Sequence, residues 1–310
     1  MFKQLSSTKK GIVLAITAAV ISGFAVYINK EGVALVKDSD IYTTLKNVFT
    51  AVLVVSFIIF AGQASKLKKL KSGDWLALII IGLVGGSIPF LLFFKGLLMS
   101  NSAVFPALIH KTLFIWVSIF GVVFLKEKIG KIQIAALLLL LLGNLIILWP
   151  IKKIGFSGGE GLVLLATIIW AIENIIAKIA LKRIDVSVVV FGRMVFGSIF
   201  LLLYLYFSHK ITPIYILAPI AWIWIVIVGA VLFGYVVFWY SALKYLPVSL
   251  VASILVIASP ITSLLDSIFR THKYSLNQII GSLIIFLAAV IIIWLSQNIK
   301  WRKLPQSKPA

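Results

Sequence analysis

The chain has 310 residues, of which 62% are hydrophobic and only 12% are charged. Soluble globular domains are about half apolar and about a quarter charged, so a water-soluble fold would expose large apolar patches and is excluded. The formal net charge of +20 would suggest nucleic-acid binding in a soluble protein, but here the basic residues lie mainly at the ends of apolar runs. Basic residues at such places orient a membrane protein and contact anionic headgroups, so we expect the lipid bilayer, and no nucleic acid, as a partner.

Ten apolar runs follow one another along the chain, with short loops between them. A membrane-spanning helix needs about 20 apolar residues, and each run approaches that length. In chain order the runs cover residues 11–29, 41–61, 75–95, 102–124, 132–149, 161–181, 186–207, 219–240, 248–268 and 276–296. The sequence therefore predicts an all-α integral membrane protein with ten transmembrane helices. The first run has no evident signal-peptide cleavage site, so we expect it to be a retained helix.

The distribution of Lys and Arg predicts how the chain is oriented. Loops on the N-terminal side of the expected membrane carry about twice as many of these residues as the opposite loops, and the stretch from Gln63 to Asp74 alone contains four Lys. Cytoplasmic loops are enriched in basic residues, so we expect both termini in the cytoplasm and a multi-pass protein of the cell (cytoplasmic) membrane. Residues 298–310 are basic, contain Pro305 and Pro309, and are predicted to be a disordered cytoplasmic tail.

The two halves of the chain match weakly but in register. The separation between matched residues falls slowly from 148 to 145, as expected for two copies of one unit with small loop deletions. Each unit has five spans, and because five is odd the second copy must be inverted in the membrane. We therefore expect a first five-helix repeat at 11–149, a second at 159–297 and a tail at 298–310. The matches are Ser22–Lys30 with Trp170–Lys178, Lys46 with Arg193, Phe93–Leu97 with Trp239–Leu243, and Gln133 with Gln278.

Short motifs in these repeats resemble the EamA family of the drug/metabolite transporter superfamily. Trp170–Lys178 is similar to the first-span pattern W-G-x-x-x-x-x-x-K of that family, and Arg193 stands where its second span has Arg. Further similar segments are the turn Tyr240–Tyr245 with Pro247, the pair Ser259-Pro260, the turn Phe124–Ile129 (L-G-E-[KR]-[IL] in the family) and Gly143. The resemblance covers about residues 11–297. It implies an EamA-like transporter of ten helices in two inverted repeats, with export of amino-acid-like metabolites as its function.

The sequence also departs from the family pattern. Ser22 stands where Trp is usual in the first copy, Lys46 replaces Arg and keeps the charge, and Lys273 replaces the Glu of the second-copy turn. The pair His110-Lys111 in the fourth span is outside the general pattern. We interpret this pair as the mark of a subgroup with its own substrate.

Charged residues inside the spans are the main candidates for function. A charge near the bilayer centre costs roughly 2.5–3.5 kcal/mol on insertion scales, so it faces protein or water rather than lipid. Lys111 either lines a cavity as a substrate-binding cation or locks the bundle by pairing with a carboxylate or a helix end. His110, about 100° away on the helix, is either a packed histidine or a proton relay. Lys46 and Arg193 form the pseudo-symmetric pair, for which substrate-binding and structural roles are both open.

Glu173 is the only carboxylate well inside a predicted span. A lone acid in a low dielectric can take up a proton on one side and release it on the other, so Glu173 is the first candidate for proton coupling. The alternative is a fixed counter-ion to Lys111, Lys178 or Arg193. Asp266 lies four residues before Arg270, a spacing that predicts a local structural pair. The other candidates for the substrate site are Asn174, one position after Glu173, and the aromatic residues Trp170 and Tyr240, for which core packing is the alternative use.

The excess of cations over acids inside the spans favours an anionic or zwitterionic substrate held by charge-assisted hydrogen bonds. We expect a secondary transporter of a small polar organic metabolite that works by alternating access, with protons as the candidate coupling ion. The alternative among transporters is an organic-anion or phosphate-ester exchanger, and the alternative outside them is an intramembrane enzyme or a lipid-handling protein. Without a Walker A motif or Cys, and with three scattered His, we expect no enzyme activity, cofactor or metal site. The sequence leaves open whether the protein forms a homodimer.

Overall fold

The computed structural model describes residues 7–100, 104–150 and 158–298, and every regular element in these ranges is helical. From residue 299 onward the predicted tail lies outside the described residues. The first half contains α1 (Ser7–Val36), α2 (Ser39–Phe60), α3 (Ala64–Lys68), α4 (Ser72–Gly86), α5 (Ile88–Met99), α6 (Val104–Lys111), α7 (Leu113–Leu125) and α8 (Lys131–Ile147). The second half contains α9 (Gly159–Ala180), α10 (Val186–Phe191), the π-helix η1 (Gly192–Phe196), α11 (Gly197–Phe207), the 3-10 helix η2 (Thr212–Ile216), α12 (Pro219–Tyr245), α13 (Val248–Leu255), α14 (Ala258–Asp266), the π-helix η3 (Ser267–Thr271) and α15 (Leu276–Asn298).

The ten predicted spans correspond to the helices of the structure. Nine segments of the described chain are long and apolar enough to cross a membrane, and the tenth predicted span is the shorter apolar helix α8, with 17 residues. The prediction of an all-α membrane fold is therefore confirmed. The boundaries differ most at the first span, because α1 continues past the predicted end at residue 29 to Val36. The charged residues Lys30 and Glu31 interrupt the apolar pattern there without ending the helix.

Several runs that the sequence predicts as single helices are broken in the middle. The third span changes direction at Ser87, with Pro89 in the first turn of α5, and the hydroxyl of Ser87 donates to the carbonyl of Leu83 at 2.9 Å. The ninth span is interrupted between α13 and α14, just before Pro260. Proline has no N–H to continue a helix, and nearby hydroxyls can satisfy the carbonyls that it frees. These breaks therefore follow from residues that periodicity alone overlooks.

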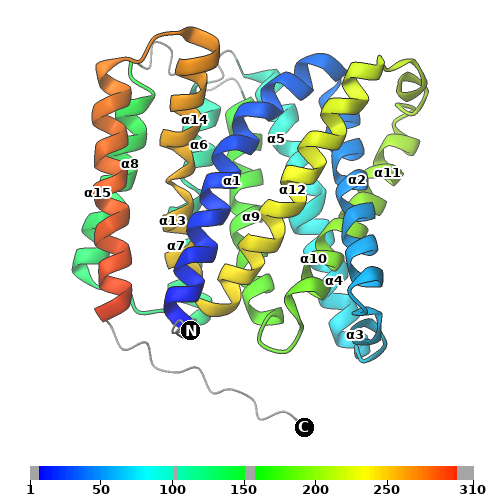
Figure 1. Cartoon of the computed structure of the whole chain (residues 1–310), viewed down its shortest axis with the longest axis horizontal. Helices are drawn as coiled ribbons and strands as arrows, with labels where there is room; N and C mark the ends of the chain where they lie inside the picture. The colour runs from blue at the N-terminus through cyan, green and yellow to red at the C-terminus, as the bar shows by residue number, and fades with distance from the viewer. Residues whose placement is uncertain (1–6, 101–103, 151–157, 299–310) are drawn as a thin grey trace.

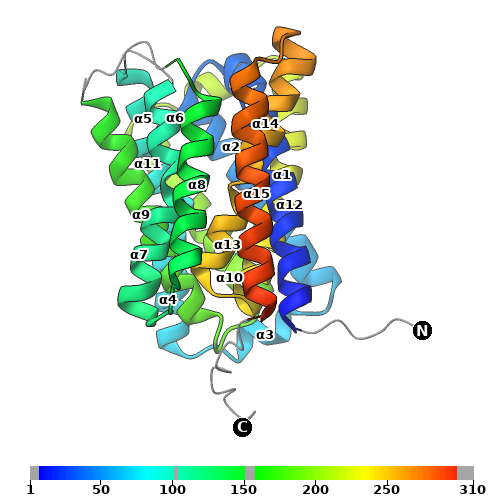
Figure 2. The same ribbon diagram turned by 90° about the vertical axis from the view of Figure 1, so that its left-hand side faces the viewer.

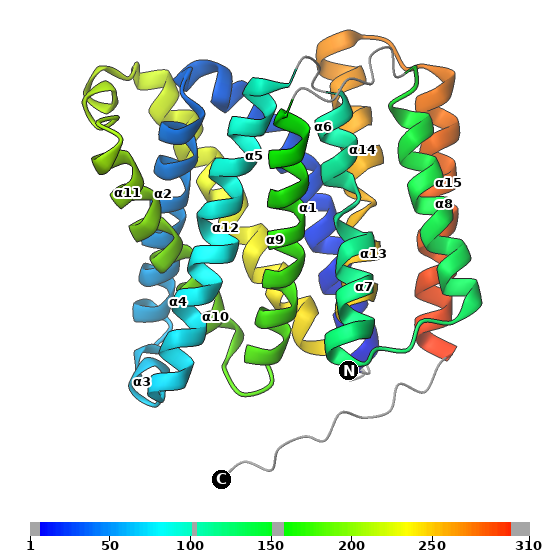
Figure 3. The same ribbon diagram turned by 180° about the vertical axis from the view of Figure 1, so that it is seen from behind.

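The helices form an upright bundle with one pair set apart at its edge (Figure 1). Helices α1 and α12 pack along much of their length on the face seen in Figure 1, while α5 and α9 pack together on the opposite face, seen in Figure 3. Helices α8 and α15 pack side by side along one lateral edge of the bundle, as both Figure 1 and Figure 2 show. The last helix of each predicted repeat therefore pairs with its counterpart, apart from the central helices.

The first helices of the two predicted repeats run in opposite directions. Helix α1 begins at the end of the bundle where α15 finishes, whereas α9 begins at the far end, where α5 finishes (Figures 1 and 3). An odd number of spans in the first repeat requires this reversal. Helix α1 packs against α12 and α2, and α9 packs against α5, α4 and α7, so both repeats contribute helices to the interior of the bundle.

Candidate functional site

Arg193 lies in a stretch of π-helix rather than in the continuous α-helix that its apolar run predicts. The span 186–207 consists of α10, η1 and α11, and the π-helix η1 covers Gly192–Phe196. On one side, η1 contacts α4 so closely that a Cβ placed on Gly86 would overlap the carbonyl oxygen of Arg193. π-helices are rare and occur frequently at functional sites. The glycine contact fixes the backbone of Arg193 and directs its side chain into the bundle.

Glu173, Arg193 and Tyr240 form a closed polar triad in the interior. Arg193 Nη1 lies 3.3 Å from Glu173 Oε2 and donates to the Tyr240 hydroxyl at 2.9 Å, and that hydroxyl donates in turn to Glu173 Oε1. Glu173 and Tyr240 are fully buried, and only 7% of Arg193 is exposed. The contacts include Gly85 of α4, where an added Cβ would lie 2.6 Å from Glu173 Cγ. Among the counter-ions left open by the sequence, Arg193 is the one that pairs with Glu173.

Asn174 and Trp170, which lie near Glu173 on α9, also form hydrogen bonds with neighbouring groups. The Trp239 indole N–H donates to Asn174 Oδ1 at 3.0 Å, and Asn174 Nδ2 donates to the carbonyl of Trp170 at 2.8 Å. The Trp170 indole N–H reaches across to the carbonyl of Gly85 at 3.2 Å. These bonds tie α9 to α12 on one side and to α4 on the other. Asn174 and Trp170 therefore hold the helices that carry the triad.

Lys178 lies at the end of a helix rather than beside the triad. Its ammonium donates to the carbonyl of Leu243 and, at 2.7 Å, to that of Leu246. These carbonyls belong to the last turn and the C-cap of α12, the negative end of that helix. Lys178 thus stabilises a helix terminus.

Lys46 is buried without a carboxylate beside it. Only 5% of the residue is exposed, and its ammonium donates to Asn29 Oδ1 at 3.0 Å, the same oxygen that accepts a 2.7 Å bond from the Tyr42 hydroxyl. The ammonium lies 5.0 Å from the ring centre of Tyr42, 5.2 Å from that of Phe90 and 5.8 Å from that of Phe94. Throughout the described chain no carboxylate lies within 4 Å of it. We call Lys46, Asn29, Tyr42, Phe90 and Phe94 the Lys46 cage.

A cluster of rings joins the Lys46 cage to His110. Phe90 contacts Trp170 with ring centres 5.1 Å apart, and Phe93 contacts Trp170 at 5.7 Å. The His110 ring lies 4.9 Å from Phe93 and 5.1 Å from Trp170, and its Nδ1 is buried without a hydrogen-bond partner among the described residues. Trp170 is one helical turn from Glu173 on α9. The tertiary structure thus brings Lys46, His110 and Trp170 together, from three different helices, and places the triad next to them.

Lys111 contacts a hydroxyl instead of an acid. Its ammonium donates to Ser259 Oγ on α14, so it bridges the fourth and ninth spans. No carboxylate of the described residues lies within 4 Å of it. The carboxylate pairing considered from the sequence is therefore not formed. Whether Lys111 binds substrate stays a prediction.

The sequence interpretation missed five contributors: Asn29, Tyr42, Phe90, Phe94 and Ser259. A polar Asn and a Tyr in otherwise apolar segments were visible signals, as was the pair of Phe residues four apart directly after Pro89. Which of the many aromatic residues face a buried cation depends on helix packing, and the sequence contains no such information.

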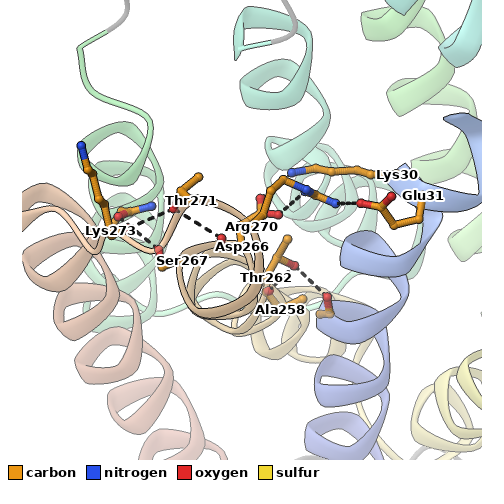
Figure 4. Close-up of polar contacts among 11 residues, drawn as sticks. Lys30, Glu31, Ala258, Thr262, Asp266, Ser267, Arg270, Thr271 and Lys273 are labelled. Carbon is orange, nitrogen blue, oxygen red and sulfur yellow. Dashed lines mark hydrogen bonds and ion pairs between the residues drawn. The ribbon is translucent and has the colours of Figure 1, made fainter.

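At the end of the bundle where α1 finishes and α15 begins, ion pairs tie α1 to the second repeat. The predicted local pair of Asp266 and Arg270 is present, but each residue also reaches α1, through Lys30–Asp266 and Arg270–Glu31 (Figure 4). One turn deeper, the Thr262 hydroxyl donates to the carbonyl of Gly23 at 2.9 Å (Figure 4). This group of contacts, between Lys30, Glu31, Asp266 and Arg270, is called the outer ion-pair cluster below.

At the opposite end, different contacts join the two repeats. Arg183 pairs with Asp74 at 2.9 Å, and Lys66 pairs with Asp185 at 3.3 Å. Glu127, in the turn before α8, accepts from the backbone N–H groups of Val248 (2.7 Å) and Ser249 (3.2 Å) at the start of α13. A carboxylate at a helix N-terminus is favourably placed. Both ends of the central region are thus closed by polar contacts between the halves.

Comparisons with known proteins agree with this architecture. The sequence profile of the EamA-like transporter family matches residues 9–149 and again residues 157–294. An uncharacterized transporter, sll1164, of Synechocystis sp. is 26% identical over 248 residues, which cover 74% of this chain and 68% of that protein. An uncharacterized transporter from the cobO 3′ region of Sinorhizobium sp. is 29% identical over 116 residues, 37% of this chain and 80% of that protein. A crystal structure with 16% sequence identity has the same fold, with a TM-score of 0.77 over 94% of this chain and 99% of that one.

The family profile matches most of the chain in two successive copies, and these copies contain the helices that form the triad and the Lys46 cage. The chain therefore belongs to the EamA-like transporter family.

Proposed function

We propose that this transporter carries a small organic solute with a carboxylate group, such as an amino-acid-like metabolite, across the cytoplasmic membrane by alternating access. The observation that carries the proposal is the Lys46 cage, in which a buried ammonium has one neutral oxygen and three rings as neighbours. An ion in the membrane interior is costly unless it is paired. A solute carboxylate would supply that pairing through charge-assisted hydrogen bonds.

The surroundings of Lys46 support an organic rather than an inorganic anion. Phe90, Phe93 and Trp170 offer ring surfaces between Lys46 and His110, and the unpartnered His110 Nδ1 offers a polar contact for a solute group. Pockets for small organic molecules commonly combine aromatic walls with a few polar groups. Lys111 adds a second cation that lacks an acidic partner.

Alternating access requires contacts that can open at either end of the central region. The outer ion-pair cluster and the pairs Arg183–Asp74 and Lys66–Asp185 join the two repeats at opposite ends of the bundle. Their side chains are partly exposed, and exposed ion pairs contribute about 0–1 kcal/mol each. Breaking the ion pairs of one end therefore costs little, and rocking of one repeat against the other is the expected movement.

The transport proposal is tested in proteoliposomes with purified full-length protein and radiolabelled amino acids and short carboxylates as probes. Lys46→Gln should reduce uptake of the active probe at least 10-fold, because the cation that pairs with its carboxylate is lost. The matched control is Lys95→Gln on α5, since Lys95 is exposed and should not affect uptake. Equal uptake by Lys46→Gln and the unmodified protein would contradict the proposed role of Lys46.

Glu173 is proposed as the coupling group, because protonation would weaken its contact with Arg193 and thereby link a proton to the packing of α9, η1 and α12. Glu173→Gln should abolish uptake driven by a pH gradient while solute exchange at equal pH continues. If the variant still responds to the gradient like the unmodified protein, Glu173 acts only as a counter-ion.

Organic-anion exchange is the second candidate, and the cation excess of the interior favours it. Among the described residues, neither Lys46 nor Lys111 has an acidic partner, while Arg193 has one. An obligate exchanger needs a counter-solute inside the vesicle, whereas a proton-coupled carrier works into empty vesicles under a pH gradient. Uptake with and without internal solute separates the two mechanisms.

A further inference from the structure

A cavity of about 320 Å³ lies at the end of the bundle where α1 begins and α12 finishes, away from the triad and the Lys46 cage. Its walls come from the starts of α1 and α10, the last third of α2 and the C-terminal half of α12, together with Gln63 and Lys66. None of the candidate substrate residues lines it. The following inference does not depend on the proposed solute.

The rim of this cavity is basic. Lys10, Lys66, Lys244 and Asp185 line it, and the Asp185 carboxylate lies 3.3 Å from Lys66 Nζ and 3.7 Å from Lys244 Nζ. Lys10 has its ammonium 5.0 Å from the ring centre of Tyr245, and no carboxylate of the described residues lies within 4 Å of it. Two positive charges therefore remain after Asp185 is counted.

These rim residues lie at helix ends, which places them at the level of the membrane surface. Lys10 is in the first turn of α1, Lys244 in the last turn of α12, and Asp185 is the N-cap of α10. Basic residues at this level interact with anionic lipid headgroups. All of the three lysines are at least partly exposed, so a headgroup can reach them.

Below the rim the cavity becomes apolar and follows one face of α12. Lys244, Ser241, Val237 and Phe233 all line it, at successive spacings of three, four and four residues. Eleven residues of helix rise by about 16 Å, which is close to the thickness of one leaflet of the hydrocarbon core. Phe57 of α2 contacts Phe233 with ring centres 6.1 Å apart and is itself 43% exposed, so the apolar part is accessible from the side of the bundle.

We infer that this cavity binds one anionic phospholipid, with its phosphate among Lys10, Lys66 and Lys244 and an acyl chain along Val237, Phe233 and Phe57. Charge complementarity selects the headgroup, and the apolar stripe selects an amphiphile over a free anion, which would contact the rim alone. Binding of the phosphate competes with Asp185 for Lys66 and Lys244.

This competition gives a test with effects of opposite sign. Purified full-length protein is titrated with phosphatidylglycerol, and the singly bound lipid is quantified by native mass spectrometry. Lys66→Gln/Lys244→Gln should weaken binding on the order of 20-fold or more, because each lysine near the surface is worth about 5-fold. Asp185→Asn should strengthen binding several-fold, since it frees both lysines. Misfolding cannot produce such a gain, and the Asp185 side chain makes no capping hydrogen bond that the variant would lose.

The matched control is Lys68→Gln/Lys69→Gln, which removes two exposed lysines of the same segment that do not line the cavity; its affinity should be unchanged. Phosphatidylcholine with the same acyl chains should bind at least 10-fold more weakly, and inorganic phosphate should not displace the lipid at millimolar concentration. Equal binding of the two lipids, displacement by phosphate alone, or equal loss in the control variant would each overturn the inference.

Discussion

The two pseudo-symmetric cations of the interior, Arg193 and Lys46, have opposite surroundings. Both are buried, with 7% and 5% of the residue exposed. Arg193 contacts the Glu173 carboxylate and the Tyr240 hydroxyl, whereas Lys46 contacts the amide oxygen of Asn29 and three rings. In the second repeat the protein itself supplies the anion, while in the first repeat the contacts of the cation with described residues are all to neutral groups.

This difference indicates that the two repeats have different roles. A guanidinium forms directional bonds with two partners at once and suits a fixed contact, whereas an ammonium on a flexible stem adapts to different partners. We therefore interpret the triad as the group proposed for structure and coupling, and the Lys46 cage as the group proposed for solute binding. The following predictions test this contrast, from the largest expected effect to the smallest.

Arg193→Met should destabilise the protein by about 3–5 kcal/mol, because it leaves the fully buried Glu173 carboxylate without its cation. Lys46→Met, by contrast, removes a buried charge that has no acidic partner, so its thermal unfolding in detergent should stay the same or occur at higher temperature. Both are measured by thermal unfolding of the purified variants. The double variant Arg193→Met/Glu173→Gln should recover much of the lost stability. Similar losses in Arg193→Met and Lys46→Met would remove the contrast.

Gly85→Ala should destabilise the protein by about 1–3 kcal/mol, as expected for an overpacked interior. The added methyl group would lie 2.6 Å from Glu173 Cγ and would displace the carboxylate from Arg193. Gly234→Ala on α12 is the control, because its Cβ would be 3.6 Å from its nearest neighbour, Ile21. If both variants unfold at the same temperature, the triad tolerates movement and is not a fixed contact.

Lys111→Ala should weaken solute binding about 10-fold, or about 1.4 kcal/mol, while changing the unfolding temperature little. Its hydrogen-bond partner is the Ser259 hydroxyl, so the variant leaves no buried carboxylate unpaired. Ligand-induced thermal shifts with the transported probe measure both quantities in one experiment. A lower unfolding temperature with unchanged ligand shift would assign Lys111 to the structural lock instead.

Lys210→Gln should cost no more than about 1 kcal/mol, because Lys210 is partly exposed and its ion pair is screened by solvent. Lys210 lies in the loop after α11 and donates to Asp40 at 2.6 Å at the start of α2, the helix that carries Lys46. Its hydrogen bond with the Asp40 carboxylate, assisted by Asp38, raises the pKa of Lys210 above the ordinary 10.5. The pair thus stabilises the fold below that range and loses its effect as pH rises through the raised pKa. The difference in unfolding temperature between variant and unmodified protein should accordingly be present at pH 7 and shrink above pH 10.5; a constant difference would point to packing.

Much of the architecture follows from local sequence. Ten apolar runs, two copies of one motif set and the odd number of spans in each copy predict the ten-helix membrane fold and the opposite directions of α1 and α9. The embedded charges Lys46, Lys111, Glu173 and Arg193 are identified by their positions in these runs, because an isolated charge in an apolar stretch stands out without any structure.

The partners of those charges could not be predicted in the same way. The choice among three possible counter-ions for Glu173 depends on a π-helix and on the contact of Gly86 with the backbone of Arg193. Two of the rings that face Lys46, Phe90 and Phe94, lie 44 and 48 positions away in the sequence. The hydroxyl that accepts from Lys111 lies 148 positions away.

The sequence by itself determined the membrane environment of this protein, the places of its membrane-spanning segments and the identity of its buried charges, since these depend on composition and period along one chain. Only the tertiary structure decided which cation is neutralised and which is enclosed by rings. That distinction is set by how the helices pack within each repeat, with α1, α2 and α5 around Lys46 and α9, η1 and α12 around Glu173, at sequence separations that no local pattern encodes.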